Sequence, residues 1–322
     1  MLTALLLAAA STLPPLPQVS GTPPLAGGKG VTQFTFYVAG DSRPDKGDDP
    51  SPGFEAMIPA MQTAMKTAPA AFVLWGGDII KGKKSSDAKT QYPLVLPYFA
   101  KLGVPVFNVP GNHEAEKKGS GDCNDAIDAD GKLLADYTKS VSAQPYGWFQ
   151  YGNSVFIGIS TEEIPGKNHQ PSGCFNGYVS PTQMQLVQAK IASLPAGTNV
   201  FLFMHRPTQD DNDHVIAPDP ADQKTAYGKQ LIAFVDWVNA LPNPNVVAIF
   251  ASHDHRYFAN PVAAGKAPVI ITGGAGAPLS GCSHGGNPGA YYHWLQVTVD
   301  GASAKVTVVP LTTTQLCGAP PA

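Results

Sequence analysis

Residues 104–114 read VPVFNVPGNHE, a valine-rich apolar run that ends in a Pro-Gly pair and is followed by three polar side chains. A run of this composition, bounded by turn residues, predicts a buried β-strand. Asn112, His113 and Glu114 would then lie just beyond the carboxyl end of that strand. Taken alone, the segment could equally be an ordinary turn, because motifs this short also arise without function.

Four more strand-like runs end in polar residues that can bind a metal. They carry the segments GDSR (40–43), GGD (76–78), FMHRP (203–207) and SHDH (252–255). In open α/β sheets, ligands bind in the crevice beyond the carboxyl ends of the strands. The five segments can therefore converge on one place, although they are spread from residue 40 to residue 255.

Together these segments supply nitrogen and oxygen donors and no sulfur. The candidate metal ligands are two carboxylates, one carboxamide and three imidazoles: Asp41, Asp78, Asn112, His205, His253 and His255. Such a set suits zinc, manganese or iron better than magnesium or copper(I). Six ligands are too many for one tetrahedral ion, whereas two ions that share a carboxylate can clamp a phosphoryl group and generate a hydroxide. Each residue also has a structural alternative, such as a helix cap for an aspartate, but five strand ends of this kind favour a metal site.

The order of apolar patterns along the chain predicts the fold class. The strand-like runs are FTFYVAG, AFVLWGGD, VPVFNVPG, SVFIGIS, NVFLFMH, VVAIFASH and PVIITGG. Between them, apolar residues at helical spacing predict helices over residues 54–66 and 227–241, and a capping box at residues 180–183 begins a third. The segment 291–311 alternates like a β-hairpin with Asp300-Gly301 at its turn. Strands that alternate with helices before a β-rich end predict an α/β domain with mixed sheets.

In order and context, the five segments resemble the motifs of the calcineurin-like metallophosphoesterase family. That family's pattern is D-x-H, G-D, G-N-H-[D/E], a lone histidine and G-H-x-H, and the match runs from about Phe34 to Leu311. The resemblance implies a four-layer α-β-β-α sandwich of two mixed sheets, with a di-metal site at the strand ends. It also implies a metal-dependent phosphoester hydrolase, a phosphatase or phosphodiesterase, that uses a hydroxide activated by two divalent metal ions.

The resemblance also implies a role for each site residue. It implies that Asp78 bridges the two ions. Asp41 and His255 would bind the first ion, and Asn112, His205 and His253 would bind the second. His113 would stand beside the ions as a general acid, or as a cation that stabilises the transition state.

The sequence departs from the family pattern at two positions. Ser252 replaces a glycine, which is a small change. Arg43 stands where D-x-H would place a histidine ligand, and a guanidinium has no lone pair with which to coordinate. The first ion would then keep only three protein ligands, and we expect its site to be weak. We expect Arg43 to bind substrate by forking onto a phosphate oxygen; the alternative is a surface or supporting ion pair with an acidic loop residue, such as one in segment 210–213.

The expected substrate is a small-molecule or lipid-linked phosphoester, and monoesters, diesters, nucleotides and pyrophosphates all stay open. Substrate choice is expected to lie in four long polar loops: 115–145, 162–178, 208–226 and 278–292. A net charge of −3 argues against nucleic acid, since duplex binding usually shows as a basic patch. The alternative function is a non-catalytic phosphate- or ligand-binding protein on the same scaffold, which Arg43 alone favours.

The N-terminus bears on the compartment. It reads MLTALLLAAAS, like a secretory signal with a small-residue cleavage site, although no lysine or arginine precedes the apolar stretch. We expect residues 1–30 to be a signal-like segment and flexible lead-in, residues 31–322 to form a single domain without a transmembrane segment, and the protein to be secreted or periplasmic. Four cysteines in an exported chain favour disulfides, expected between Cys123 and Cys174 and between Cys282 and Cys317. Without export, all four would be free thiols.

Overall fold

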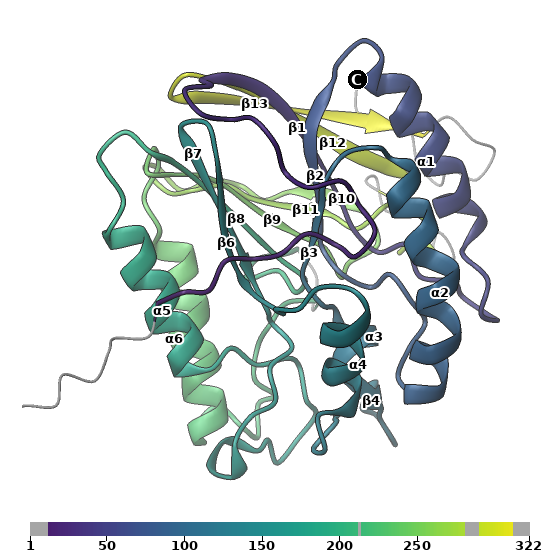
Figure 1. The fold of residues 1–322 in the computed structure, drawn as a ribbon. Helices are drawn as coiled ribbons and strands as arrows, with labels where there is room; N and C mark the ends of the chain where they lie inside the picture. Colours follow the sequence, from purple (N-terminus) through teal and green to yellow (C-terminus); the bar gives the residue numbers. More distant parts are fainter. Residues whose placement is uncertain (1–11, 212–213, 281–289, 312–322) are drawn as a thin grey trace, which may run out of the picture.

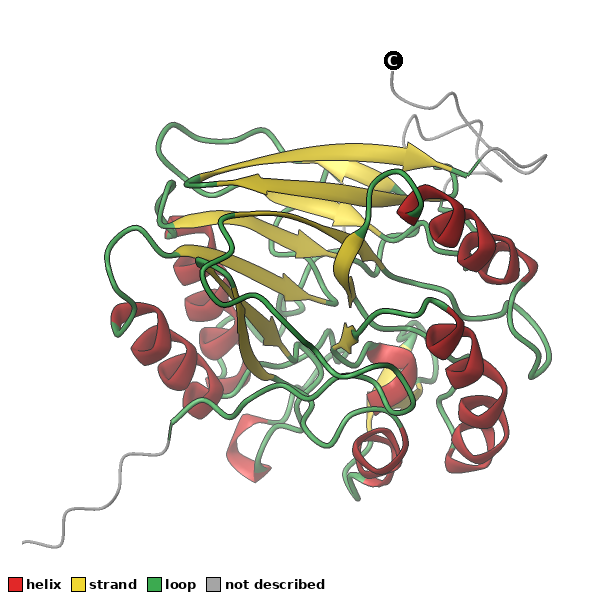
Figure 2. Ribbon diagram, turned by 45° about the horizontal axis from the view of Figure 1, so that its top comes forward, coloured by secondary structure: helices red, strands yellow, loops and turns green. Residues whose placement is uncertain are grey.

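In the computed structural model, which describes residues 12–211, 214–280 and 290–311, two β-sheets stack face to face. Helices cover the outer face of each sheet (Figures 1 and 2). The helices α1, α2 and α4 lie on one side, and α5 and α6 lie on the other. This arrangement confirms the four-layer sandwich of two mixed sheets.

The first sheet has the strand order β13-β12-β1-β2-β3. Its strands are β1 (Gln33–Ala39), β2 (Ala70–Trp75), β3 (Val106–Asn108), β12 (His293–Asp300) and β13 (Ser303–Pro310). The first three run parallel, and β12 joins β1 antiparallel. The predicted hairpin is present, but Asp300 pairs with Ser303, so its turn is Gly301-Ala302, one residue later than predicted. Gly301 takes the positive φ of 59° that such a tight turn requires.

The second sheet has the order β10-β11-β9-β8-β7-β6. Its strands are β6 (Gly147–Tyr151), β7 (Ser154–Ile159), β8 (Asn199–Met204), β9 (Val246–Ala251), β10 (Tyr257–Ala259) and β11 (Val269–Thr272). The four inner strands are parallel, and the two edge strands are antiparallel. A small ribbon of β4 (Glu116–Lys118) and β5 (Asp125–Ile127) stands apart from both sheets.

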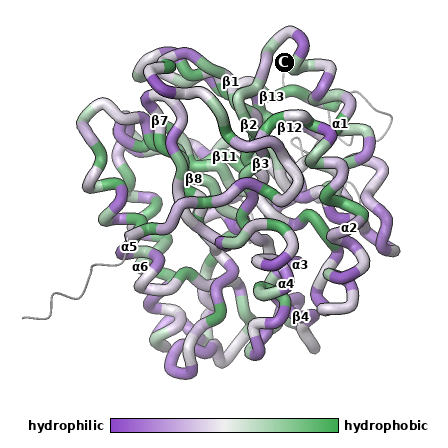
Figure 3. The backbone as a smooth tube through the Cα atoms, in the orientation of Figure 1, coloured by the Kyte–Doolittle hydropathy of each residue, from purple (hydrophilic) through white to green (hydrophobic). Residues whose placement is uncertain are grey.

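Phenylalanine rings fill the space between the two sheets. Phe36, Phe72, Phe156 and Phe201 belong to one buried cluster there, and the rings of Phe36 and Phe72 stack with centroids 5.3 Å apart. Alternate residues of the same strands, such as Tyr37, pack against the helices instead. Because successive side chains of a strand point to opposite faces, each inner strand is buried on both sides. This is why these strands read as continuous apolar runs, drawn in green along β2, β8 and β11 in Figure 3.

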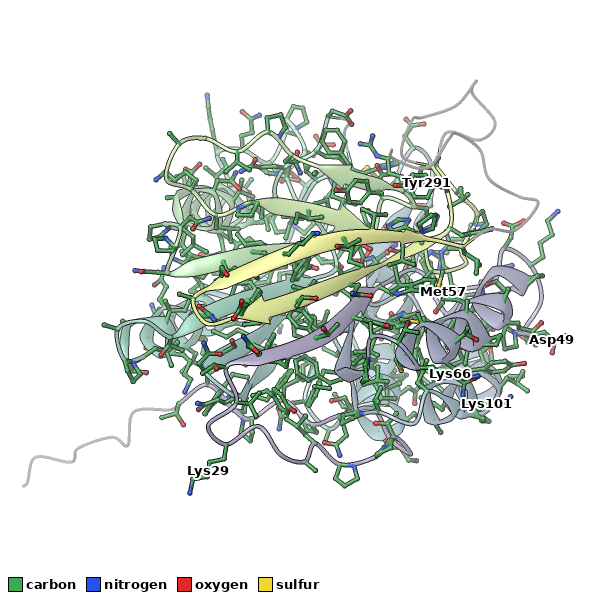
Figure 4. All side chains as sticks on the ribbon, turned by 90° about the horizontal axis from the view of Figure 1, so that it is seen from above. Lys29, Asp49, Met57, Lys66, Lys101 and Tyr291 are labelled. Carbon is green, nitrogen blue, oxygen red and sulfur yellow. A yellow bond between two sulfur atoms is a disulfide. The ribbon has the colours of Figure 1, made fainter. Side chains whose placement is uncertain are left out.

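The three predicted helices are present. They are α1 (Pro52–Met65), α5 (Pro181–Ala192) and α6 (Ala226–Ala240). The Ser180 hydroxyl accepts a hydrogen bond from the Gln183 N–H at 3.1 Å, as the capping box predicts. In Figure 4, Lys29 and Asp49 extend away from the sandwich, whereas Met57 of α1 lies over the first sheet, where it is fully buried.

Two further helices were not predicted. They are α2 (Ser85–Lys101) and α4 (Lys132–Ser140), beside the single turns α3 (Asn112–Ala115) and η1 (Lys167–His169). Pro93 and Pro97 lie inside α2, where each removes a backbone hydrogen bond, so the sequence argued against a helix there. Both prolines are exposed, while Tyr92, Val95 and Phe99 are buried against the sheet. Packing of that apolar face outweighs the local propensity.

The described part of the lead-in differs from the flexible segment that we expected. Leu13, Leu16 and Val19 are buried. The Leu16 N–H donates to the Trp148 carbonyl at 2.9 Å, and the Val19 N–H donates to the Val106 carbonyl at 2.7 Å. This stretch, purple in Figure 1, thus runs along β6 and β3, the edge strands of the two sheets. The prolines suggested flexibility, but the apolar residues between them are buried against the sandwich. The signal-like residues 1–11 lie outside the described part of the chain.

The disulfide predicted between Cys123 and Cys174 is present. It ties the loop between β4 and β5 to the loop that precedes α5. The predicted pair of Cys282 and Cys317 falls outside the described residues. Within the described ranges, no helix combines the length and apolar character needed to cross a membrane.

Candidate metal centre

The five polar segments meet at one edge of the sandwich, beyond the carboxyl ends of β1, β2, β3, β8 and β9. Side chains from both sheets contact each other there. Nε2 of His205, after β8, lies 2.9 Å from Oδ1 of Asn112, after β3. The N–H of His253, after β9, donates to Oδ2 of Asp41, after β1, at 2.9 Å. The predicted ligands are therefore neighbours in space.

Three of these residues have a backbone conformation that side chains rarely adopt. Among the described residues, Asp41, Asp78, Lys83 and His253 are the non-glycine positions with positive φ, at 62°, 52°, 65° and 70°. Such conformations are strained by about 1–3 kcal/mol each and concentrate at functional sites. Here they turn the chain sharply at the end of β1, β2 and β9.

His205 and Asn112 present two acceptor atoms to each other. Nδ1 of His205 lies 2.7 Å from the Gly76 carbonyl, so Nδ1 carries the proton and Nε2 a lone pair. The amide nitrogen of Asn112 donates to both oxygens of Asp125, at 3.1 and 3.3 Å, which turns Oδ1 toward His205. Two acceptors 2.9 Å apart have no proton to share. A cation between them removes the conflict, so these residues fit a metal.

The spacing around His205 is that of one coordination shell. Its Nε2 lies 3.1 Å from Nδ1 of His253 and 3.5 Å from Oδ1 of Asp78. An ion bound at about 2.1 Å has neighbouring ligand atoms about 3.0–3.4 Å apart in octahedral or tetrahedral geometry. Ligand atoms of Asp41, Asp78 and His205 also lie within 4.8 Å of one another, which makes them a group able to hold a metal ion.

The part of the site expected to hold the first ion, around Asp41 and His255, contains fewer possible metal-ligand atoms. Nε2 of His255 lies 3.6 Å from Oδ1 of Asp41, and Nδ1 of His255 is held by the Pro278 carbonyl at 2.5 Å. Oδ1 of Asp41 is buried without a hydrogen-bond partner. Nε of Arg43 lies 3.5 Å from Oδ2 of Asp78, so the guanidinium faces the carboxylate that was expected to bridge two ions.

Arg43 does not pair with the acidic loop residues that were its alternative partners. Asp210 and Asp211 form ion pairs with Arg256 instead. That alternative is wrong for these two residues, and residues 212 and 213 of the same segment fall outside the described ranges. Arg43 is 19% exposed through its side chain and points into the site.

Burial and mutual repulsion act on the two aspartates. Burial, followed by the nearby charge of Asp78, raises the pKa of Asp41 well above its usual value. Burial would also raise the pKa of Asp78, but the Arg43 guanidinium and the hydrogen bond from the His113 N–H, among other contacts, hold that pKa below its usual range. A bound cation would favour the charged form of both carboxylates.

His113 lies beside the ligand set. Its Nδ1 contacts the Lys81 carbonyl, and its Nε2 lies 3.9 Å from Oδ2 of Asp78. The His113 N–H donates to Oδ1 of Asp78 at 3.0 Å. Burial lowers the pKa of His113 well below its usual value. The contact between Nδ1 and the Lys81 carbonyl orients the ring with its Nε2 toward the site.

A family model described as calcineurin-like phosphoesterase matches residues 34–257. The chain belongs to this family. Members are metallophosphoesterases that usually use a two-metal centre, so the resemblance read from the motifs is confirmed. No curated protein matches the chain.

Several solved structures are similar to this chain at low identity. One is GAP50, the anchor in the inner membrane complex of Plasmodium, at 13% identity and a TM-score of 0.48, covering 88% of this chain and 87% of that one. Another is a putative 5'-nucleotidase from Staphylococcus aureus, at 12% identity and a TM-score of 0.43, covering 88% and 55%. A third is the sulfate thiohydrolase SoxB of Thermus thermophilus, at 15% and 0.44, covering 83% and 44%. We draw nothing about activity from these likenesses.

Behind the predicted ligands lies a buried charge cluster that the sequence did not predict. Nε of Arg206 donates to Glu162 at 3.0 Å, and Nη2 donates to Glu116 at 3.0 Å and to Asp125 at 3.3 Å. Nη1 lies 3.2 Å from Nε2 of His253. Because a guanidinium only donates, Nε2 of His253 accepts and the ring proton lies on Nδ1. That proton lies toward Nε2 of His205, 3.1 Å away. Metal binding through Nδ1 of a neutral ring therefore requires the proton to move to Nε2 and the Arg206 contact to lengthen.

This cluster contacts predicted ligands that follow strands of both sheets. Asp125 orients the amide of Asn112, and Arg206 contacts the ring of His253. Lys83 forms an ion pair with Asp125. The sequence offered one signal for Arg206, which is its position directly after the predicted ligand His205. Its carboxylate partners lie on the short strands β4 and β5 and in the segment after β7, where the sequence shows no recognisable pattern.

Two other residues support the strand ends. Glu114 accepts hydrogen bonds from the N–H groups of Asp78, Ile79, Ile80 and Gly111, at 2.8–3.1 Å, and so ties the end of β2 to that of β3. Burial raises its pKa to about 8. Ser252, the residue that replaces a glycine of the motif, is buried against Gly40 and Gly76, where any added Cβ would collide with it.

A cavity of about 900 Å³ opens over the site. Its lining includes residues from all four loops expected to set substrate choice: Lys118 and Asp122, Cys174 and Asn176, Asp219, and Ser280. Lys81, Lys83 and Lys84 line a further wall beside His113. The loops are thus placed to contact a bound molecule, and their part in substrate choice stays a prediction.

Proposed function

We propose that this protein is a metal-dependent phosphoester hydrolase. The observation that carries the proposal is the pair of acceptor atoms on Asn112 and His205, which face each other beside Asp78 in a calcineurin-like phosphoesterase. Asn112, His205 and His253 would hold one divalent ion together with Asp78. Asp41 and His255, again with Asp78, offer ligands for the first ion of the family's two-metal arrangement. When bound, such ions polarise phosphoryl oxygens and lower the pKa of water.

Two side chains of the chain itself would then act on substrate. Arg43 would donate to a non-bridging phosphate oxygen, a contact for which a planar guanidinium is suited. His113 would give a proton from Nε2 to the departing oxygen only as the imidazolium, because in the neutral ring the single proton lies on Nδ1, against the Lys81 carbonyl, with Nε2 turned toward the cavity. General acid catalysis of this kind typically contributes about 10²–10⁴-fold.

The proposed substrate is a small-molecule or lipid-linked phosphoester that fits the cavity over the site. We also propose that the protein is exported to a secreted or periplasmic location, because disulfides such as Cys123–Cys174 form and persist in oxidising compartments.

A second candidate function is a non-catalytic phosphate- or ligand-binding protein on the same scaffold. The contact between Arg43 and Asp78 favours it, because a guanidinium at this place binds an anion without activating water.

One assay separates the two functions. Purified protein with manganese is tested on p-nitrophenyl phosphate and bis-p-nitrophenyl phosphate, before and after chelation, with Asn112→Ala as the matched variant. We expect hydrolysis that chelation and Asn112→Ala both abolish. Phosphate binding without turnover of either ester would instead support the binding protein, and turnover that survives chelation would refute metal dependence.

A further inference from the structure

The two halves of the metal site are unequal. On one side, three possible metal-ligand atoms lie 2.9–3.5 Å from Nε2 of His205, as in a single coordination shell. They belong to Asn112, His253 and Asp78. On the other side, Asp41 and His255 are the remaining ligands, with their nearest atoms 3.6 Å apart. The second side also contains a permanent positive charge.

That charge is placed by the backbone. The N–H groups of Ser42 and Arg43 both donate to the Asp78 carbonyl, at 3.0 and 2.9 Å. This anchors the start of the Arg43 side chain beside Asp78. Its Nε is buried and has no hydrogen-bond partner, so nothing else in the described part of the protein draws the guanidinium aside.

Arg43 also competes for the oxygen that a first ion would need. Oδ1 of Asp78 is engaged by the His113 N–H at 3.0 Å and lies toward His205. Oδ2 is the oxygen left for an ion on the other side, and Nε of Arg43 lies 3.5 Å from it. An ion bound there would sit next to a like charge that cannot deprotonate or coordinate.

The charge balance supports the same conclusion. Asp41 and Asp78 are the carboxylates at the centre of the site, because Glu114 is occupied by four backbone N–H groups. One divalent ion and one guanidinium already exceed the charge of these two aspartates. The site is then net positive and suited to a phosphate anion without a second ion.

We propose that this protein retains one divalent ion per chain, held by Asp78, Asn112, His205 and His253, and that the Arg43 guanidinium takes the place of the other ion. The proposal deepens the proposed function and rests on it for the meaning of the site. Arg43 supplies a fixed positive charge to a phosphate oxygen, while the single ion supplies the Lewis acid.

Metal content tests the proposal without any measurement of turnover. Each protein is loaded with manganese, desalted and analysed by plasma mass spectrometry. We expect about one ion per chain in the wild type and about two in Arg43→His, which removes the charge and adds a neutral ligand. Lys81→His, which adds an imidazole to the lining of the same cavity, is the control and should stay at one. Two retained ions in the wild type, or one in a folded Arg43→His, would overturn the proposal.

Two further variants locate the ion. His205→Ala should lose it, whereas His255→Ala should keep it, and the reverse pattern would also overturn the proposal. A far-ultraviolet circular dichroism spectrum shows that each variant is folded, and the wild-type value does not depend on any variant. The two proposals can fail separately. One retained ion without hydrolysis refutes the hydrolase alone, and hydrolysis with two retained ions refutes the single-ion site alone.

Discussion

Removing the guanidinium of Arg206 should destabilise the protein strongly. The side chain is 4% exposed and meets Glu162, Glu116 and Asp125, all of which are themselves buried. Arg206→Ala would leave these carboxylates without their shared counter-charge. Deleting one partner of a buried ion pair typically costs about 3–5 kcal/mol. At about 2.1 cal/mol/K per residue, the 322-residue chain has an unfolding entropy near 0.7 kcal/mol/K, so Tm should fall by about 4–7 °C.

The loss should also depend on pH in a defined direction. Burial would raise the pKa of Glu162, but Arg206 and further contacts hold it below its usual value. In Arg206→Ala that pKa should rise above the unfolded value, because burial then acts with less opposition. A carboxyl whose folded pKa is raised destabilises the fold increasingly as pH rises. The difference in Tm should therefore be smaller at pH 5 than at pH 8.

Differential scanning calorimetry at these two pH values measures both effects. Arg206→Lys keeps the charge and should lose less stability. Lys132→Ala removes the cation of an exposed pair with Asp130 and should change stability by less than about 1 kcal/mol. A decrease in Tm of less than 2 °C for Arg206→Ala, or a larger decrease at pH 5 than at pH 8, would refute the reasoning.

Three further predictions concern neighbouring features. His113→Ala should lower kcat by about 10²–10⁴-fold while metal content, read by plasma mass spectrometry, stays unchanged; parallel loss of metal and activity would give His113 a structural role. Asp125→Ala frees the Asn112 amide to rotate and should weaken manganese binding by about 10–100-fold in a chelator competition, and unchanged affinity would show that Asp125 does not orient that ligand. Cys123→Ser with Cys174→Ser opens a loop with a sequence separation of 51 and should cost about 4 kcal/mol in a urea titration under oxidising conditions, where a loss below 1 kcal/mol would contradict the estimate.

The strands and their polar ends were predictable because burial on both faces leaves a simple pattern. β8, for example, is buried at every position, and His205 follows its end directly. The helix α2 was missed because Pro93 and Pro97 are local signals, whereas the packing that overrides them is tertiary. The extended segment around Leu16 was missed for the same reason, since its partners on β6 and β3 are more than eighty residues away.

The predicted metal ligands and the residues that contact them also differ in how far the sequence predicts them. Each ligand follows a strand, so its position could be expected from the fold class. The partners of Arg206 lie on the short strands β4 and β5 and in the segment after β7, and Glu116, Asp125 and Glu162 become recognisable only once the chain has folded around them. Arg43 was singled out by sequence as a departure from a motif. Its distance from Asp78 shows what that departure does to the site.

Anomalous diffraction from manganese-soaked crystals would test most directly whether these strand ends enclose a cation. We predict an anomalous peak within bonding distance of Oδ1 of Asn112 and Nε2 of His205, with Asp78 and His253 completing the protein ligands. A map without a peak there, or with the ion bound by residues elsewhere in the cavity, would contradict the metal centre on which the proposed hydrolysis depends.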